Sequence, residues 1–136
     1  MARILIVDDD PTIRHLLDDV LRIDEGYETF QAADGQAAVE IAREEQPEVI
    51  LMDLTLPVLS GEAAIRMLKD DAQTRGIRII AMSSGVNLRR HVDDLLADGL
   101  LGKPFDLDTL SANVALQLRH AVVPSLSGSD GAKEID

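Results

Sequence analysis

The stretch Ile4-Leu5-Ile6-Val7-Asp8-Asp9 places two acids directly after a continuous apolar run. A second run of the same kind, Val49-Ile50-Leu51-Met52, ends at Asp53. Short runs without a polar residue are typical of strands that are buried on both faces, as in a parallel sheet. Parallel strands end at the same edge of their sheet, so the two runs bring Asp8, Asp9 and Asp53 to one rim.

A cluster of three carboxylates needs a physical explanation. Two carboxylates about 4 Å apart repel by roughly 4 kcal/mol at an effective dielectric of 20, so the cluster takes up protons, splays apart or holds a cation. A few carboxylates that leave room for water and a phosphate oxygen suit Mg²⁺ better than Ca²⁺. Zinc is not indicated, because the chain has no cysteine and its histidines share no metal-binding spacing: they are His15, His91 and His120.

Composition limits the other classes of function. The formal net charge is −12, and the chain has one tyrosine, two phenylalanines and no tryptophan. Neither binding of a nucleic-acid backbone nor stacking on bases is therefore expected. No apolar stretch is long enough to span a membrane and no signal segment precedes the first strand, so we expect a cytoplasmic protein without membrane contact.

The 136 residues fit one domain, in which apolar runs of strand length alternate with segments of helical period. We expect strands at 4–7, 27–32, 49–53, 77–82 and 100–102. Helices are expected after the caps Asp10, Ser60 and Asp106 and from near Asp34-Gly35, with a weaker fourth helix carrying Leu88, Val92, Leu95 and Leu96. This alternation predicts an α/β fold: a flavodoxin-like (βα)5 domain whose doubly wound, five-stranded parallel sheet has the order 2-1-3-4-5 and helices on both faces.

Two of these helices have a clear apolar stripe. The first carries Ile13, Leu16, Leu17, Val20 and Leu21 on one face that we expect to be buried, and the last carries Leu107, Leu110, Val114 and Leu118. The domain is expected to occupy residues 1–122. Residues 123–136 are mainly Ser, Gly and charge, which predicts a disordered C-terminal tail or linker stump.

The rim that holds the acids is also the expected binding site. In an open doubly wound sheet, ligands bind beyond the carboxyl ends of the strands where the winding direction reverses, here between the first and third strands. Ser83 and Lys103 reach the same rim from the fourth and fifth strands. A lysine supplies a point charge and a serine a hydroxyl donor for phosphate oxygens, and a carboxylate can itself accept a phosphoryl group.

These motifs, in this order, resemble the receiver domain of bacterial response regulators over about residues 2–121. They are Asp8-Asp9, Asp53 followed by Pro57 and Gly61, Ser83-Ser84, and Lys103-Pro104-Phe105. The resemblance implies a signalling receiver, not an enzyme in the ordinary sense, that supports its own phosphorylation and dephosphorylation. It also implies partners: a sensor histidine kinase or phosphotransfer protein, a downstream protein that the sequence does not identify, and in many relatives a second copy of the chain.

The resemblance further assigns a role to each site residue. Asp53 would accept the phosphoryl group from a phosphohistidine. Mg²⁺ would be held by Asp8, Asp9, Asp53 and the backbone carbonyl of Thr55. Ser83 and Lys103 would hold phosphoryl oxygens, and the bond between Lys103 and Pro104 would be cis.

One position departs from the family pattern. Most receivers carry an aromatic residue three positions before the lysine, where this chain has Leu100. In the family this ring moves inward when the hydroxyl at the Ser83 position turns toward the phosphoryl group. We therefore expect weaker signalling to the face formed by the fourth helix, fifth strand and fifth helix, or a different packing change.

Two other classes of function stay open beside the phosphoacceptor switch. Leu100 is compatible with a receiver-shaped module that binds its partner regardless of phosphorylation. A Mg²⁺-dependent phosphohydrolase, as in haloacid-dehalogenase-like enzymes, would use Asp53 as a transient nucleophile. Such enzymes need a second acid two residues later, where this chain has Thr55, so this alternative is disfavoured.

Overall fold

The structure is a computed structural model that describes residues 1–84 and 96–121. Two of the expectations above fall on other residues. The expected fourth helix, apart from Leu96, lies outside the described residues, and so does the expected tail at 123–136. Both stay predictions.

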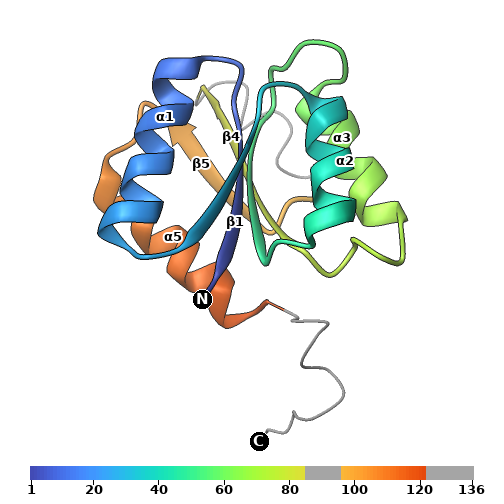
Figure 1. Ribbon diagram of the computed structural model, residues 1–136. Helices are drawn as coiled ribbons and strands as arrows, with labels where there is room; N and C mark the ends of the chain where they lie inside the picture. Colours follow the sequence, from blue (N-terminus) through green and yellow to red (C-terminus); the bar gives the residue numbers. More distant parts are fainter. Residues whose placement is uncertain (85–95, 122–136) are drawn as a thin grey trace, which may run out of the picture.

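Five parallel strands form one sheet in the order β2-β1-β3-β4-β5 (Figure 1). Their bounds are β1 Arg3–Val7, β2 Glu28–Ala32, β3 Val49–Asp53, β4 Arg78–Ser84 and β5 Gly99–Lys103. The order and direction confirm the predicted doubly wound fold. Every residue of β3 is buried, whereas β2 at the edge of the sheet has one exposed and three half-buried residues, in agreement with its mixture of polar and apolar residues.

The described helices are α1 Pro11–Asp19, α2 Gly35–Glu45, α3 Gly61–Asp70 and α5 Leu107–Arg119. Each begins where it was predicted, directly after a residue whose side chain accepts a hydrogen bond from a backbone N–H in the first turn. The pairs are Asp10 with Thr12, Asp34 with Ala37, Ser60 with Ala63, and Asp106 with Thr109. α2 ends at Glu45, and the next residue, Gln46, has a φ of 50°. Pro47 follows and disfavours a helical conformation of the residue before it.

Helices cover both faces of the sheet, with α1 and α5 on one side and α2 and α3 on the other (Figure 1). Alternate residues of the strands therefore enter two apolar cores. Leu5, Ile50 and Ile79 pack with α2 and α3, whereas Ile4, Leu51 and Ile80 pack with α1 and α5. Burial on both faces explains why the central strands are apolar without interruption.

The expectation for Leu16 was wrong. Leu16 is 51% exposed, whereas Leu17, Val20 and Leu21 are buried against the sheet. The buried stripe follows Leu17, and Leu16 lies about 100° around the helix from it. After Asp19 the helix also widens into a π-helical turn, Val20–Asp24, which the spacing did not predict.

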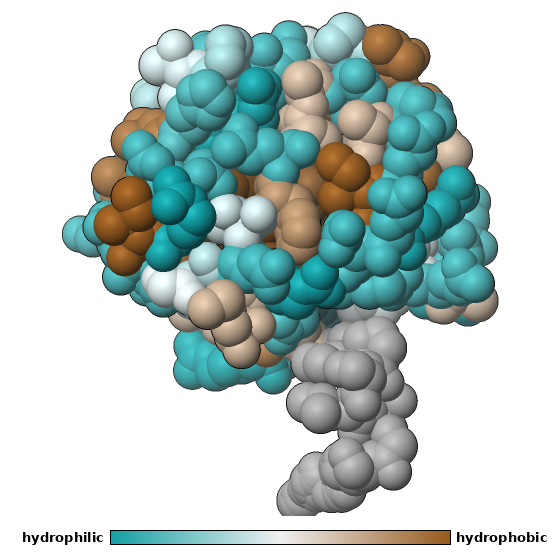
Figure 2. Space-filling view, viewed as in Figure 1, coloured by the Kyte–Doolittle hydropathy of each residue, from teal (hydrophilic) through white to brown (hydrophobic). Residues whose placement is uncertain are grey.

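Most of the coloured surface on the face shown in Figure 2 is hydrophilic. On the face in Figure 2, hydrophobic residues form small patches separated by hydrophilic ones. Within residues 1–84 and 96–121, no helix combines the length and the apolar character that crossing a membrane requires.

Candidate functional site

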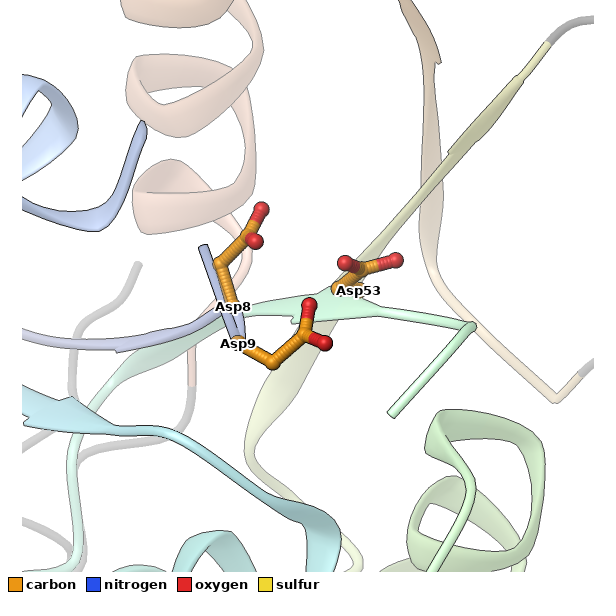
Figure 3. Close-up of side chains that lie close together, drawn as sticks. All are labelled: Asp8, Asp9 and Asp53. Carbon is orange, nitrogen blue, oxygen red and sulfur yellow. The ribbon is translucent and has the colours of Figure 1, made fainter. Parts of the chain in front are cut away.

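The predicted acids meet at the carboxyl ends of β1 and β3. Asp8 and Asp9 follow β1, Asp53 ends β3, and one carboxylate oxygen from each lies within 4.8 Å of the others. Figure 3 shows the Asp9 side chain reaching toward Asp53. The register explains the meeting, because Val7 pairs with Met52 and the next residue of each strand is therefore at the same height.

The acids form part of the wall of an open cleft of about 330 Å³. The residues that line it are Asp8, Asp9, Asp10, Ile13, Asp53, Thr55, Ser83 and Lys103. The structure thus brings together every site residue that the sequence predicted. Asp10, predicted only as a helix cap, is a further acid on the cleft wall.

Lys103 forms ion pairs with two of the acids. Its Nζ donates to Asp8 Oδ2 at 2.8 Å and to Asp53 Oδ2 at 3.3 Å. Partial burial would lower the lysine pKa, but the bonds and charges of Asp8 and Asp53 outweigh burial and raise it. Lys103 is therefore protonated at neutral pH. Its bond to Pro104 is cis, as the resemblance implied.

Asp53 is 6% exposed, and its Oδ1 accepts a hydrogen bond from the Thr55 N–H at 3.1 Å. Its pKa is raised, first because burial disfavours the charge and further because of the negative charge of Asp8. The Thr55 amide and Lys103 act in the opposite direction but do not cancel the shift. The lining of the cleft also carries more carboxylates than ammonium groups, because Asp8, Asp9 and Asp53 face the single ammonium of Lys103.

The two acids after β1 differ in environment. Asp8 is fully buried, and its Oδ1 accepts the Asp10 N–H at 3.0 Å while its Oδ2 accepts from Lys103. Asp9 is exposed. The carboxylates of Asp8, Asp9 and Asp53 thus differ in exposure but converge on one cleft. Together they form a set of donors that consists of oxygen atoms only. Such a set fits a hard divalent cation, which would relieve the excess negative charge.

Gly61 allows the loop after β3 to fold tightly beside Asp53. A Cβ on Gly61 would lie 2.0 Å from the Asp53 carbonyl oxygen and 2.7 Å from the Leu54 Cα. The Gly61 N–H donates to the Leu54 carbonyl at 3.1 Å. The start of α3 therefore packs directly on the backbone of the last residue of β3, and this close approach sets the position of Asp53.

Sequence reasoning missed one residue at this site. Arg14, in the second turn of α1, donates from Nη1 to the Asp8 carbonyl at 2.8 Å and from Nε to Gln31 Oε1 at 3.0 Å. An arginine six residues after an acid carries no specific signal, so nothing in the sequence could have singled it out.

The fold and the cleft define a class of protein: a doubly wound α/β domain with carboxylates and a lysine at the place where the winding direction of the sheet reverses. The family model for the response regulator receiver domain matches residues 4–115, and the chain belongs to this family. Members of the family are signalling modules of two-component systems.

Relatives agree with this assignment. The DNA-binding dual master transcriptional regulator RpaA of Synechocystis sp. is 36% identical over 122 residues, which cover 88% of this chain but 50% of that protein. The chain thus spans about half the length of this relative. Sporulation initiation phosphotransferase F of Bacillus subtilis is 36% identical over 110 residues, which cover 79% of this chain and 86% of that protein.

A solved structure also matches closely. The receiver domain of sensor histidine kinase PA1611 from Pseudomonas aeruginosa has a TM-score of 0.80 and 30% identity, and the match covers 87% of this chain and 98% of that one. That structure is described as having a magnesium ion coordinated in the active site cleft.

Proposed function

We propose that this chain is a phosphoacceptor: Asp53 takes a phosphoryl group from a phosphohistidine of a sensor histidine kinase or phosphotransfer protein. The observation that carries the proposal is the convergence of Asp8, Asp9 and Asp53 within 4.8 Å, with Lys103 paired to two of them. The magnesium ion in the PA1611 receiver domain supports Mg²⁺ as the cation.

Asp53 provides the nucleophile. Transfer forms a bond between one of its carboxylate oxygens and phosphorus and breaks the phosphorus–nitrogen bond of the donor, whose imidazole leaves with the electron pair. Asp53 must be ionised to attack, and Lys103 together with the Thr55 amide favours the ionised form against burial. The Thr55 N–H also fixes the orientation of the carboxylate through Oδ1.

The other site residues hold the group and its charge. Lys103 Nζ lies 3.3 Å from Asp53 Oδ2, within reach of a phosphoryl oxygen attached to that side chain. Ser83, 5% exposed on the cleft wall, is proposed as a hydroxyl donor to another phosphoryl oxygen. Asp8, Asp9, Asp53 and the Thr55 carbonyl would hold Mg²⁺, which when bound neutralises charge on the transferring group.

Phosphorylation would switch a surface that binds a downstream protein, and the same site would support the slow return to the unphosphorylated form. We place the protein in the cytoplasm, where a kinase phosphohistidine is accessible. Pairing with a second copy of the chain stays a prediction, as does the identity of the kinase and of the downstream protein.

A second function keeps support from one observation. Leu100 is half-buried and packs against the apolar core shared with α2 and α3. A leucine held there lacks the polar edge of an aromatic switch residue, which favours a module that binds its partner without phosphorylation. The phosphohydrolase alternative loses support, because Thr55 contributes its backbone amide to Asp53 and has no acidic side chain.

The decisive experiment is the intact mass of the chain after treatment with acetyl phosphate and Mg²⁺. We expect one phosphoryl adduct on the native chain and none on Asp53→Asn. The matched control is Asp34→Asn, which changes an acid after β2 where asparagine also caps a helix. An adduct on Asp53→Asn, or none on the native chain, would contradict the proposal. Normal partner binding and signalling by Asp53→Asn would favour the second function instead.

A further inference from the structure

Arg14 connects the segment after β1 that carries Asp8 and Asp9 to the sheet. It lies half-buried in α1, and its guanidinium donates to the Asp8 carbonyl at 2.8 Å and to Gln31 Oε1 in β2 at 3.0 Å. The side chain is thus held at two points on different elements. A planar guanidinium can hold both acceptors in one fixed geometry, which the single ammonium of lysine cannot do.

The Asp8 carbonyl matters because its peptide unit leads directly to Asp9. The Asp8 N–H donates to the Ala32 carbonyl at 3.2 Å, and its two carboxylate oxygens accept from Asp10 and Lys103. Arg14 therefore completes the set of contacts that fixes Asp8. The Asp8 carbonyl and the Asp9 N–H belong to one planar peptide unit, so fixing that carbonyl also fixes the direction in which Asp9 leaves β1.

Asp9 depends on this constraint more than the other acids do. Its side chain is exposed, and within residues 1–84 and 96–121 no hydrogen bond or ion pair holds its carboxylate. Of the contacts among these described residues, only those of the backbone set its place in the cleft. A peptide free to rotate at this point would let Asp9 sample positions outside the donor set, and binding a cation would then require ordering it.

Electrostatics alone predicts the opposite effect. Arg14 is a permanent cation beside a site for another cation, so its charge repels a divalent ion. Removing the charge should then strengthen Mg²⁺ binding, whereas removing a constraint on the donor set should weaken it. The sign of the change therefore separates the two effects.

We infer that Arg14 is a positioning residue, anchored by Gln31, that preorganises Asp8 and Asp9 for a divalent cation. The inference rests on the proposed function, because it concerns the same Mg²⁺ site. Partners of this kind, one step removed from the metal, typically change metal affinity by about 10-fold to 100-fold when they are removed. Arg14 touches no reacting atom, so its loss should change the Mg²⁺ requirement and not the rate at saturating Mg²⁺.

The test measures the dissociation constant of Mg²⁺ by isothermal titration calorimetry on the full chain, for Arg14→Met, Arg14→Lys and Gln31→Met. The control is Arg22→Met, which removes the same charge from the π-helical turn after α1, where Arg22 pairs with Asp18 and Asp19. We expect about 10-fold weaker binding for Arg14→Met. Arg14→Lys and Gln31→Met should lie between it and the native chain, and Arg22→Met should stay within about 2-fold.

The second readout is the rate of phosphorylation by acetyl phosphate against Mg²⁺ concentration. The half-saturating Mg²⁺ concentration of Arg14→Met should rise by the same factor, while the rate at saturation stays within about 2-fold of the native value. Equal or tighter Mg²⁺ binding by Arg14→Met, or equal weakening by Arg22→Met, would overturn the inference. A reduced rate at saturation with unchanged affinity would also overturn it.

Failure of the site and failure of the inference are distinguishable. A native chain that binds no Mg²⁺ would overturn both the proposed function and the role of Arg14. Native binding with unaltered affinity in Arg14→Met would overturn the role of Arg14 alone. If Arg14→Met does not fold, Gln31→Met decides, and unchanged Mg²⁺ affinity in that variant overturns the inference.

Discussion

Replacing Gly61 by alanine tests how tightly the loop after β3 is packed on the strand that ends at Asp53. Gly61 is the first residue of α3, and its φ is not in the left-handed region. Helix propensity alone therefore predicts that alanine stabilises the protein, by up to about 1 kcal/mol. The packing of the native structure predicts instead that alanine destabilises the protein.

Three distances set the free-energy cost of Gly61→Ala. The added Cβ would lie 2.0 Å from the Asp53 carbonyl oxygen, 2.7 Å from the Leu54 Cα and 2.8 Å from the Asp53 carbonyl carbon. All three atoms are backbone atoms, so no side-chain rotation can relieve the contact. The start of α3 or the end of β3 must shift by about 1 Å to restore a normal separation, and overpacking of this kind costs roughly 1–3 kcal/mol or more. Because Asp53 carries one of the clashing groups, the rate of phosphorylation should fall as well.

The assay is urea unfolding followed by circular dichroism, with Gly99→Ala as the matched control. A Cβ at Gly99 would meet the side chains of Gln117 at 2.9 Å and Asn113 at 3.0 Å, which can move. We expect Gly61→Ala to lose at least 2 kcal/mol, by the overpacking range of roughly 1–3 kcal/mol or more, and Gly99→Ala to lose about 1 kcal/mol. A Gly61→Ala chain as stable as the native one, or more stable, would refute the steric argument.

Three further predictions address the charges and the packing of the site. The pKa of Asp53 is raised, so the folded state holds this proton more strongly than the unfolded chain does. The contribution of Asp53 to stability therefore falls as pH rises from the ordinary aspartate pKa through the raised one. In urea unfolding without Mg²⁺, the stability of Asp53→Asn relative to the native chain should therefore increase across this pH interval. If the native chain instead becomes the more stable of the two as pH rises, the raised pKa of Asp53 is contradicted. Lys103→Met leaves the fully buried Asp8 without its ion-pair partner and should lower the free energy of unfolding by about 2–3 kcal/mol in the same assay. Breaking a wholly buried pair costs roughly 3–5 kcal/mol, and we expect less here because the Lys103 side chain is 24% exposed. Its control, Arg43→Met, breaks an exposed pair with Asp71 and should cost less than about 1 kcal/mol, and equal losses would show that the buried pair has no special weight. Leu100 in place of an aromatic residue should give only a small change in hydrogen exchange of β5 and α5 on adding beryllofluoride with Mg²⁺, with a larger change in Leu100→Tyr; a large change in the native chain would contradict this.

The negative charge of the site explains why stability and function oppose each other here. Asp8 and Asp53 are buried next to each other, and Lys103 provides the ammonium that both share. Burial that raises the pKa of Asp53 also makes the ionised, metal-free protein less stable than it would be with an amide at this position. A cation that binds the folded state alone would return that stability by mass action. Under the proposed function, this excess negative charge is what would draw a cation to the site.

The sequence by itself determined the sheet and the composition of the site. Uninterrupted apolar runs such as residues 4–7 can only be buried on both faces, and their alternation with helical periods leaves few topologies apart from the one observed. Each strand end then carries its acid, serine or lysine to one rim, because parallel strands share a direction. The helix starts at Asp10, Asp34, Ser60 and Asp106 were equally predictable, since a cap depends on residues two or three positions away.

Only the tertiary structure decided the contacts that join distant parts of the chain. The exposure of Leu16 depends on how α1 is rotated against the sheet, and its periodicity could not show this. Lys103 pairs with Asp8, 95 residues away, and with Asp53, 50 residues away, although the sequence indicated only that it would reach a phosphate. Arg14 meets Gln31 and the Asp8 carbonyl, and Gly61 meets the Asp53 backbone, through the packing of helices against strands. Periodicity and capping are local properties that short segments carry, whereas these contacts exist only after the helices and strands have packed together.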